Sequence, residues 1–211
     1  MALRKWKTKE QTIGSWEDLV QLESDQICNE QRMIYRGQRN AKWGLTPSLS
    51  REWGDILDRE DEILEAEKTL LQEFKTAAHL YLDTRLIPTD NQLMGWWATM
   101  QHHGAPTRLL DWTSSFFVAA YFATEDASDD DGAIWCLNAD RLKKDAGPKS
   151  GFYGFSDLAS PSFNDVLYHH KQTVVGVVAN GRPGEREVVQ QGCFTFSNEL
   201  ACPHDLRASA H

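Results

Sequence analysis

The segment from Gln101 to Ser115, QHHGAPTRLLDWTSS, constrains the fold of this chain more than any other stretch. It follows an apolar helical pattern, NQLMGWWATMQHH, and Gly104 and Pro106 impose a bend directly after that pattern. APTRLLDW then leaves room for only a short extended segment before a second helical pattern, SSFFVAAYFATEDA, which Thr113 or Ser114 is expected to cap. A dense group of polar side chains is therefore expected around a helix end, a bend and a helix start.

The other hydrophobic patterns predict an α+β protein. SWEDLVQLE predicts a helix capped by Ser15, RMIYRG a strand ending at Gly37, and the apolar spacing from Asp55 to Asp83 a long helix. GAIWCLNA, TVVGVVA, EREVV and CFTF are typical of later strands. Residues 38–54 are rich in turn residues, and residues 140–172 resemble a loop with short helices. We expect a single domain in which helices precede a small mixed β-sheet, with an extension at 1–14, the domain at 15–197 and a fraying tail at 198–211.

The charge balance narrows the classes of function. The 211 residues include 22 Lys and Arg against 31 Asp and Glu, a formal net charge of −9. This charge disfavours binding along an extended nucleic-acid duplex, although it leaves room for a local basic pocket. No stretch is long and apolar enough to span a membrane, and the basic N-terminus lacks the apolar segment of a signal peptide. The four cysteines are far apart, without a CxxC pair, so we expect a protein of the reducing cytoplasm.

The polar segment offers two interpretations of its central arginine. Arg108 could bind a phosphate with both arms of its guanidinium, close to the free N–H groups at the helix start near Ser114. Alternatively, Arg108 and Asp111 form a buried pair that holds the bend. Gln101 and Trp112 belong to the same segment and are candidate ligand contacts.

The two adjacent histidines of this segment do not favour a metal site. Neighbouring positions on a helix point about 100° apart, so His102 and His103 rarely hold one ion together. A hydrogen-bonding or acid–base role for one of them is the better interpretation. We therefore expect no metal cofactor.

Two further groups of residues are candidate site residues. Tyr35, Arg36, Gly37 and Gln38 end a predicted strand, where Arg36 would project into a cleft and Gly37 would let a ligand approach; a surface arginine beside a turn is the alternative. Glu185, Glu187 and Gln191 would share one face of a late strand, either as acid–base groups or as the solvent face of an edge strand.

These motifs, in this order, resemble the FRG domain family, which is named for an aromatic-Arg-Gly motif. Tyr35-Arg36-Gly37 matches that motif, and QHHGAPTRLLDWTSSFFVAAYFA resembles the family's QHxGxPTRLLDWT stretch and the small-residue helix after it. The late R…QxG.F pattern is matched by Arg186, Gln190 or Gln191, Gly192 and Phe194. The resemblance covers about residues 15–197. It implies a setting in bacterial and phage genomes near defence and toxin systems, with an antitoxin or defence protein as a partner, and leaves the activity to be argued from the site.

Two main functional hypotheses follow. The first is an ADP-ribosyltransferase-like enzyme that uses NAD. Arg36 would hold the NAD phosphates, Thr113, Ser114 and Ser115 would resemble the Ser-Thr-Ser segment, and Glu185 and Glu187 the terminal ExE motif, with Trp112 or Tyr35 against the nicotinamide. The second is a binding or sensing module that holds a nucleotide or a nucleic-acid end through Arg36, Arg108, Gln101 and His103. A third hypothesis, a nuclease-type hydrolase, would use His102 or His103 with Asp111. A cleft between YRG, the bend and the EREVVQQG strand is expected in each case.

Overall fold

Within the described residues, six strands form one mixed sheet at the centre of the molecule. The computed structural model describes residues 9–27, 32–54, 56–57, 59–125, 130–141, 151–153, 167–168, 175–179, 192–198 and 200. The strands are β1 (Met33–Gln38), β2 (Leu110–Thr113), β3 (Ala133–Asn138), β4 (Gly151–Tyr153), β5 (Val175–Ala179) and β6 (Gly192–Ser197). Their order in the sheet is β3-β1-β2-β6-β5-β4, and all neighbours are antiparallel except β4 and β5. The predicted α+β class and mixed sheet are confirmed.

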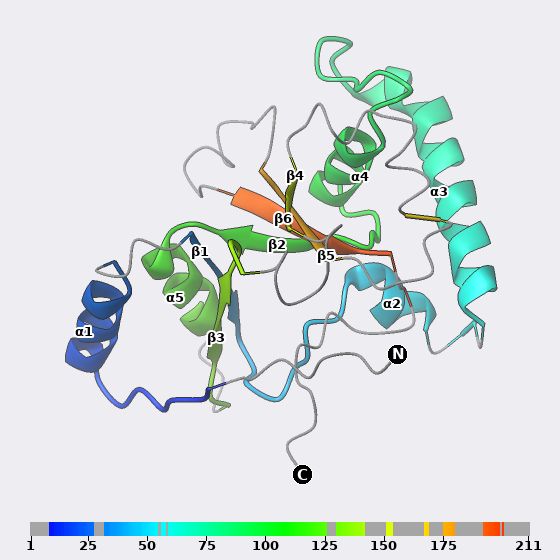
Figure 1. Cartoon of the computed structure of the whole chain (residues 1–211). Coiled ribbons are helices and arrows are strands. Elements are labelled where there is room, and N and C mark those ends of the chain that lie inside the picture. The colour runs from blue at the N-terminus through cyan, green and yellow to red at the C-terminus, as the bar shows by residue number, and fades with distance from the viewer. Residues whose placement is uncertain are drawn as a thin grey trace.

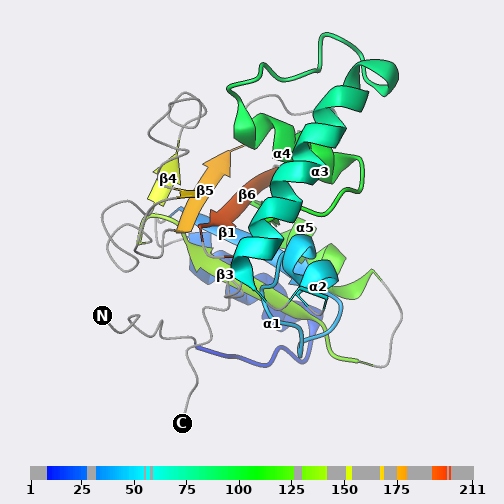
Figure 2. The same ribbon diagram turned by 90° about the vertical axis from the view of Figure 1, so that its right-hand side faces the viewer.

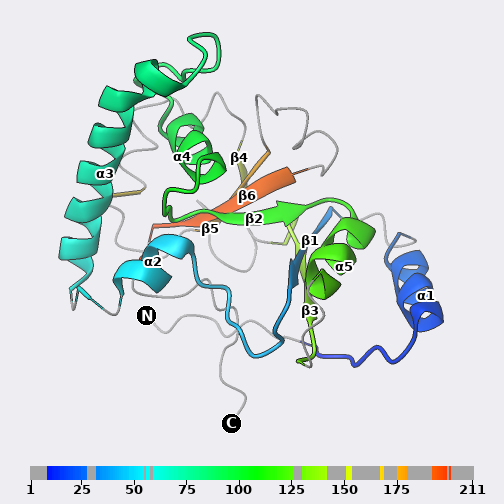
Figure 3. The same cartoon turned by 180° about the vertical axis from the view of Figure 1, so that it is seen from behind.

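The helices cover the sheet in two groups. The described helices are α1 (Trp16–Ile27), α2 (Ser48–Trp53), α3 (Glu60–Tyr81), α4 (Leu93–His102) and α5 (Phe116–Thr124). Helices α1 and α5 lie at the end of the molecule formed by β1 and β3, whereas α2, α3 and α4 lie toward the other end (Figures 1 and 3). Figure 2 shows the long helix α3 passing in front of the sheet. The expectation that helices precede the strands is wrong, because β1 and β2 alternate with helices along the chain.

The helix boundaries follow local capping chemistry. Ser15 begins α1 as predicted, since its Oγ accepts a hydrogen bond of 3.1 Å from the Asp18 N–H. Helix α4 ends where Gly104 adopts a φ of +83°, a conformation that favours glycine. The cap of α5 is Ser115, whose Oγ accepts from the Val118 N–H, and not Thr113 or Ser114 as expected. Thr113 instead accepts a hydrogen bond from the Ser115 N–H and orients the turn before the helix.

Some elements depart from the sequence-based expectation. The turn-rich residues 38–54 contain α2, which follows Pro47 and is too short to show a helical period. Leu200 lies in the segment expected to fray, yet it is buried against Leu49 and Ile63, and its carbonyl accepts a 2.9 Å hydrogen bond from Ser50 Oγ. The predicted strand EREVV lies outside the described residues.

Strand β1 presents different chemistry on its two faces. Tyr35 packs edge-on against Phe116 of α5, with ring centroids 5.3 Å apart. On the other face Ile34 joins the main apolar cluster with Leu110 and Trp112. This alternation places the Arg36 side chain on the face of β1 opposite to α5.

No helix among the described residues has the length and apolar character that crossing a bilayer requires.

Candidate functional site

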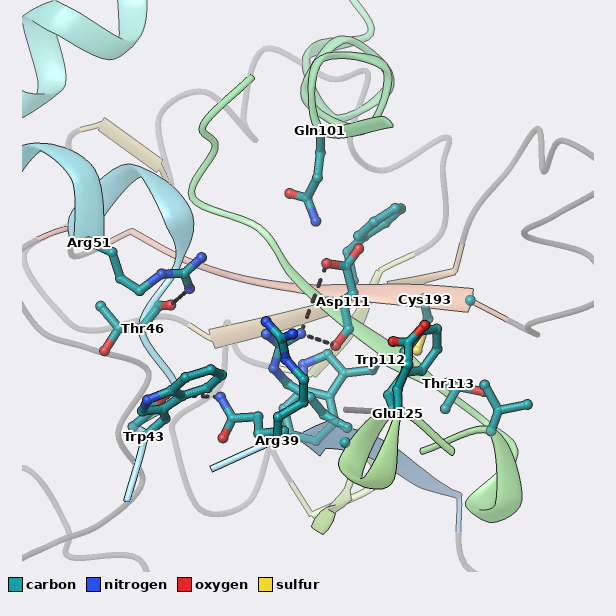
Figure 4. Close-up of a pocket in the computed structure, with 18 of the residues that line it drawn as sticks. Arg39, Trp43, Thr46, Arg51, Gln101, Asp111, Trp112, Thr113, Glu125 and Cys193 are labelled. Carbon is teal, nitrogen blue, oxygen red and sulfur yellow. Dashed lines mark hydrogen bonds and ion pairs between the residues drawn. The ribbon is translucent and has the colours of Figure 1, made fainter. Parts of the chain in front are cut away.

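The site lies where β1 and β2 separate. These strands share one registered residue pair, Tyr35 with Thr113, and Arg36 is the next residue along β1. Arg36 reaches across to the neighbouring strand, where its Nη1 donates a 2.8 Å hydrogen bond to the Asp111 carbonyl. The Asp111 carboxylate lies 3.9 Å from the same nitrogen. A cavity of about 1020 Å³ opens around this contact (Figure 4), at the large end of the range for small-molecule sites.

Six parts of the chain line this cavity. The end of β1 and the residues after it form one side, the last turn of α4 another, and β2, β6 and α5 the rest, with one side chain from α2. The lining residues are Arg36–Arg39, Lys42–Gly44, Thr46, Arg51, Ala98, Gln101, His102, Asp111–Thr113, Val118, Phe122, Glu125 and Gly192–Phe194. The tight bend of the Gln101–Ser115 segment thus brings α4 and β2 to the same cavity as β1, as the sequence predicted.

The lining is basic although the chain is acidic. Four basic side chains, Arg36, Arg39, Lys42 and Arg51, line the cavity together with two carboxylates, Asp111 and Glu125, whereas the chain as a whole carries a charge of −9. A cavity whose charge is opposite to that of the whole molecule attracts small anions locally.

Arg36 keeps part of its guanidinium available. Among the described residues its Nη1 alone has a hydrogen-bond acceptor, and its buried Nε has none. A buried donor without an acceptor costs about 1–3 kcal/mol. Burial lowers the pKa of Arg36; the Asp111 carboxylate opposes this change, and the nearby charge of Arg51 adds to it. Arginine is not deprotonated in proteins, so Arg36 is a cation that lacks a full set of partners among the described residues.

Gln101 adds a further donor to the cavity. Its Oε1 accepts a hydrogen bond from Thr107 Oγ1, and Thr107 Oγ1 in turn accepts from the Leu109 N–H at 3.2 Å. This arrangement fixes the amide so that its NH₂ group is turned to the cavity. Figure 4 shows the Gln101 and Arg51 side chains pointing from α4 and α2 toward Asp111.

Arg108 lies outside the cavity. Its side chain is fully buried, with Nε donating to Glu67 of α3 at 2.7 Å and Nη1 to the Ser197 carbonyl at 3.2 Å. Its guanidinium also lies over the Trp97 ring, 4.8 Å from the centroid. Although burial lowers the pKa of Arg108, the Glu67 charge and hydrogen bond outweigh burial and raise it. The alternative pairing of Arg108 with Asp111 is therefore wrong: the partner is Glu67, and Asp111 faces Arg36.

The predicted site residues fall into three groups. Those that line the cavity are Arg36, Gly37, Gln38, Gln101, His102, Asp111 and Trp112. Those that do not are Tyr35, His103, Arg108 and Ser114. Glu185, Glu187 and Gln191 lie outside the described residues, so of the expected late-strand wall only Gly192 and the residues after it are seen. A ligand-binding or catalytic role for these residues remains a prediction.

Several lining residues were not singled out from the sequence. Arg39 and Lys42 closely follow the YRGQ motif, and Arg51 lies on the short helix α2. The Arg39 guanidinium lies over the Trp43 ring, 5.9 Å from its centroid, and Lys42 is 3.7 Å from Asp130. The basic residues of RGQRNAKW were the available signal, because they stand close together in an otherwise acidic chain.

Cys193 lies in the cavity lining but is poorly suited to act as a nucleophile. Burial, with a smaller effect of the Asp111 carboxylate, raises its pKa to about 12, so that the group is a neutral thiol near pH 7. Among the described residues, no group of three or more His, Cys, Asp or Glu side chains is arranged to hold a metal ion.

Comparison with known proteins assigns the part of the chain that forms most of this site. Residues 31–132 match the family model of the FRG domain. The chain contains an FRG domain. The match runs from β1 through α5 and includes every described lining residue except Gly192–Phe194, so the cavity is chiefly a feature of the FRG domain. The matched range, 31–132, is shorter than the range 15–197 over which the sequence motifs resemble the family. No curated protein and no solved structure matches the chain.

Proposed function

We propose that the FRG domain binds a nucleotide in the cavity between β1 and β2, through its phosphate groups and its base. The basic lining carries this proposal: Arg36, Arg39, Lys42 and Arg51 surround one cavity of about 1020 Å³ in a chain of net charge −9. Guanidinium groups bind phosphate oxygens with two parallel hydrogen bonds, and Arg36 retains donors for this purpose. A nucleotide is small enough to enter such a cavity, whereas binding along a long duplex is disfavoured by the net charge of −9 of the chain.

Trp43 supports recognition of the base. Its side chain lies at the cavity and is 48% exposed, although tryptophan usually buries most of its surface. The Arg39 guanidinium lies near one face of the indole ring, which leaves the ring suited to stacking on a planar ligand. Stacking of a base on an aromatic side chain contributes about 1–3 kcal/mol and tolerates different bases.

The test is calorimetric titration of the protein with ribonucleoside mono-, di- and triphosphates and with NAD. We expect saturable binding of at least one nucleotide, and a loss of about tenfold or more in affinity in Arg36→Gln, because charge-assisted hydrogen bonds contribute about 1.5–3 kcal/mol. Arg85→Gln is the matched control, since Arg85 is exposed and pairs with Asp83 away from the cavity. If no nucleotide in the panel saturates the protein, or if both variants bind like the parent, the proposal fails.

A second candidate is ADP-ribosyl transfer from NAD, in the defence or toxin setting that the family resemblance implies and with an antitoxin or defence protein as partner. It is favoured by the position of a carboxylate, Asp111, and a hydroxyl, Thr113, in the same cavity as Arg36. Cleavage of the bond between nicotinamide and ribose develops positive charge on the sugar, which a carboxylate stabilises. Glu185 and Glu187 are further candidates for this role from the sequence.

Nicotinamide release from NAD separates transfer chemistry from simple binding. If the protein is a transferase, Asp111→Asn lowers kcat by about 100-fold or more while the Kd for NAD changes by only a few fold, because the carboxylate acts on the transition state. Glu125→Gln is the control carboxylate in the same cavity. NAD that binds without any release of nicotinamide, in the presence of cell extract as acceptor, would exclude this candidate and leave the binding function.

A further inference from the structure

A second, smaller cavity adjoins the nucleotide cavity. Its volume is about 190 Å³, below the roughly 300 Å³ of the smallest sites for drug-sized ligands. Four residues, Arg36, Arg51, Gln101 and Asp111, line both cavities, so the small cavity is continuous with the large one. Beyond these shared residues its wall consists of Ser48, Gly104, Ala105, Leu109 and Leu110.

The shared residues bring hydrogen-bond donors together at the junction. Arg51 donates through Nη1 to the Thr46 carbonyl at 2.6 Å, and the structure records no acceptor for the rest of its guanidinium among the described residues. Arg36 likewise uses only Nη1, and the Gln101 amide is held through its oxygen. Three side chains from β1, α2 and α4 thus present donors to one place, where the exposed Asp111 carboxylate is the facing acceptor. The two guanidinium charges repel each other, and one carboxylate balances only one of them, so a bound anion stabilises this arrangement.

The inner wall of the small cavity is formed by buried residues. Leu109 and Leu110 are buried at about 2% exposure, and Ser48 Oγ already accepts a 3.0 Å hydrogen bond from the Thr107 N–H. A ligand group that enters from the large cavity meets this wall on the protein side, whereas the exposed residues Arg51 and Gly104 border its open side. The volume of about 190 Å³ suits a single phosphate group.

We propose that the junction of the two cavities is a subsite for a terminal phosphate monoester, held by Arg36, Arg51 and Gln101. The ligand of the FRG domain is then a nucleoside or a nucleic-acid end that carries a terminal phosphate. The nucleoside part of this inference rests on the proposed function, whereas the phosphate subsite stands on the converging donors of Arg36, Arg51 and Gln101. A monoester carries up to two negative charges and three terminal oxygens, which match two guanidinium groups and an amide.

The Asp111 carboxylate fits this arrangement as a neighbour of the phosphate. It is 65% exposed, and the short hydrogen bond from Arg36 goes to the Asp111 carbonyl, with the carboxylate farther away at 3.9 Å. The carboxylate therefore retains acceptor capacity and can take a hydrogen bond from a sugar hydroxyl. A ribose next to the phosphate supplies such a hydroxyl.

The experiment compares three probes that differ only at the phosphate: adenosine, adenosine 5′-monophosphate and the methyl ester of adenosine 5′-monophosphate, a diester. Calorimetric titration should give the 5′-monophosphate at least a tenfold advantage over the methyl diester. Arg51→Gln removes this advantage, and Arg51→Lys restores part of it because the charge is kept. Arg51 is exposed, so these variants keep the fold, which circular dichroism verifies. Arg59→Gln is the control, because Arg59 is exposed and lines neither cavity.

Inorganic phosphate tests the subsite without the nucleoside. When the parent protein or the Arg59→Gln variant is added to inorganic phosphate, the phosphorus NMR signal should broaden in a saturable way. The Arg51→Gln variant should not broaden it. If phosphate binds in this way and none of the nucleosides adds affinity, the subsite is upheld and the nucleotide proposal is overturned. If the monoester and the methyl diester bind equally and Arg51→Gln changes neither, the subsite is overturned while nucleotide binding stands.

Discussion

Tyr35, Arg36 and Gly37 are consecutive in the chain, and the fold gives each a different environment. Tyr35 packs on Phe116, and Arg36 bonds the neighbouring strand beside the cavity. Gly37 lies so close to α5 that an added Cβ would be 2.0 Å from the Ala119 carbonyl oxygen and 2.7 Å from the Ala123 nitrogen. The aromatic-Arg-Gly motif is thus explained by packing, by ligand-facing charge and by close approach of a helix to a strand.

Gly37→Ala tests the close approach. The two closest atoms belong to the backbone of α5, so the strand and the helix must move apart, and overpacking of this kind usually costs about 1–3 kcal/mol and sometimes more. We expect a loss of at least that size in the free energy of unfolding, measured by urea denaturation. Gly14→Ala is the control, because nothing lies within 4 Å of its added Cβ. Equal stability of the two variants would show that Gly37 does not limit this packing.

At the residue scale, the sequence indicated the correct segments more readily than the correct partners. Arg36, Gln101 and Asp111 were predicted in one cleft and line one cavity. Arg108 was misassigned because its partner, Glu67, is 41 positions away on the helix α3, and no local pattern indicates such a pair. Arg51 was missed for a related reason, since only the fold brings α2 next to Gln101.

At the scale of elements, most strands and helix ends were predicted well, whereas helix α2 and strand β4 were missed. The predicted strands RMIYRG and CFTF coincide with β1 and β6, and α4 ends beside Gly104 as expected. Helix α2 and strand β4 span only a few residues, too few for a hydrophobic period to appear. The cap of α5 was placed up to two residues early, because Thr113, Ser114 and Ser115 are all good capping residues and only the backbone geometry selects Ser115.

At the scale of the whole molecule, one buried ion pair connects three parts of the fold. Glu67 belongs to α3, Arg108 precedes β2, and the carbonyl that Arg108 also binds belongs to Ser197 at the end of β6. Both charged side chains are almost completely buried, at 1% and 2% exposure. Such a pair holds the helical layer in position on the sheet, and the bend that leads to Asp111 starts next to it.

Arg108→Met should therefore destabilise the protein without removing a ligand contact. Removing one partner of a buried pair typically costs about 3–5 kcal/mol, because the other charge is left uncompensated. The double variant Glu67→Met/Arg108→Met should be less destabilised than either single variant, as urea denaturation would measure. Arg85→Met, which breaks an exposed pair with Asp83, should leave the denaturation midpoint unchanged. A double variant whose loss equals the sum of the two single losses would contradict this coupling.

The alternation of β1 also determines which changes of length the protein can accept. Because side chains along a strand alternate between faces, one residue inserted or deleted within Met33–Gln38 would exchange the environments of all residues beyond it. The arginine would then face α5, and a side chain would occupy the space that only glycine fits. Natural variants of this domain should consequently place their insertions and deletions in the loops on either side of β1, while the spacing inside the strand stays fixed.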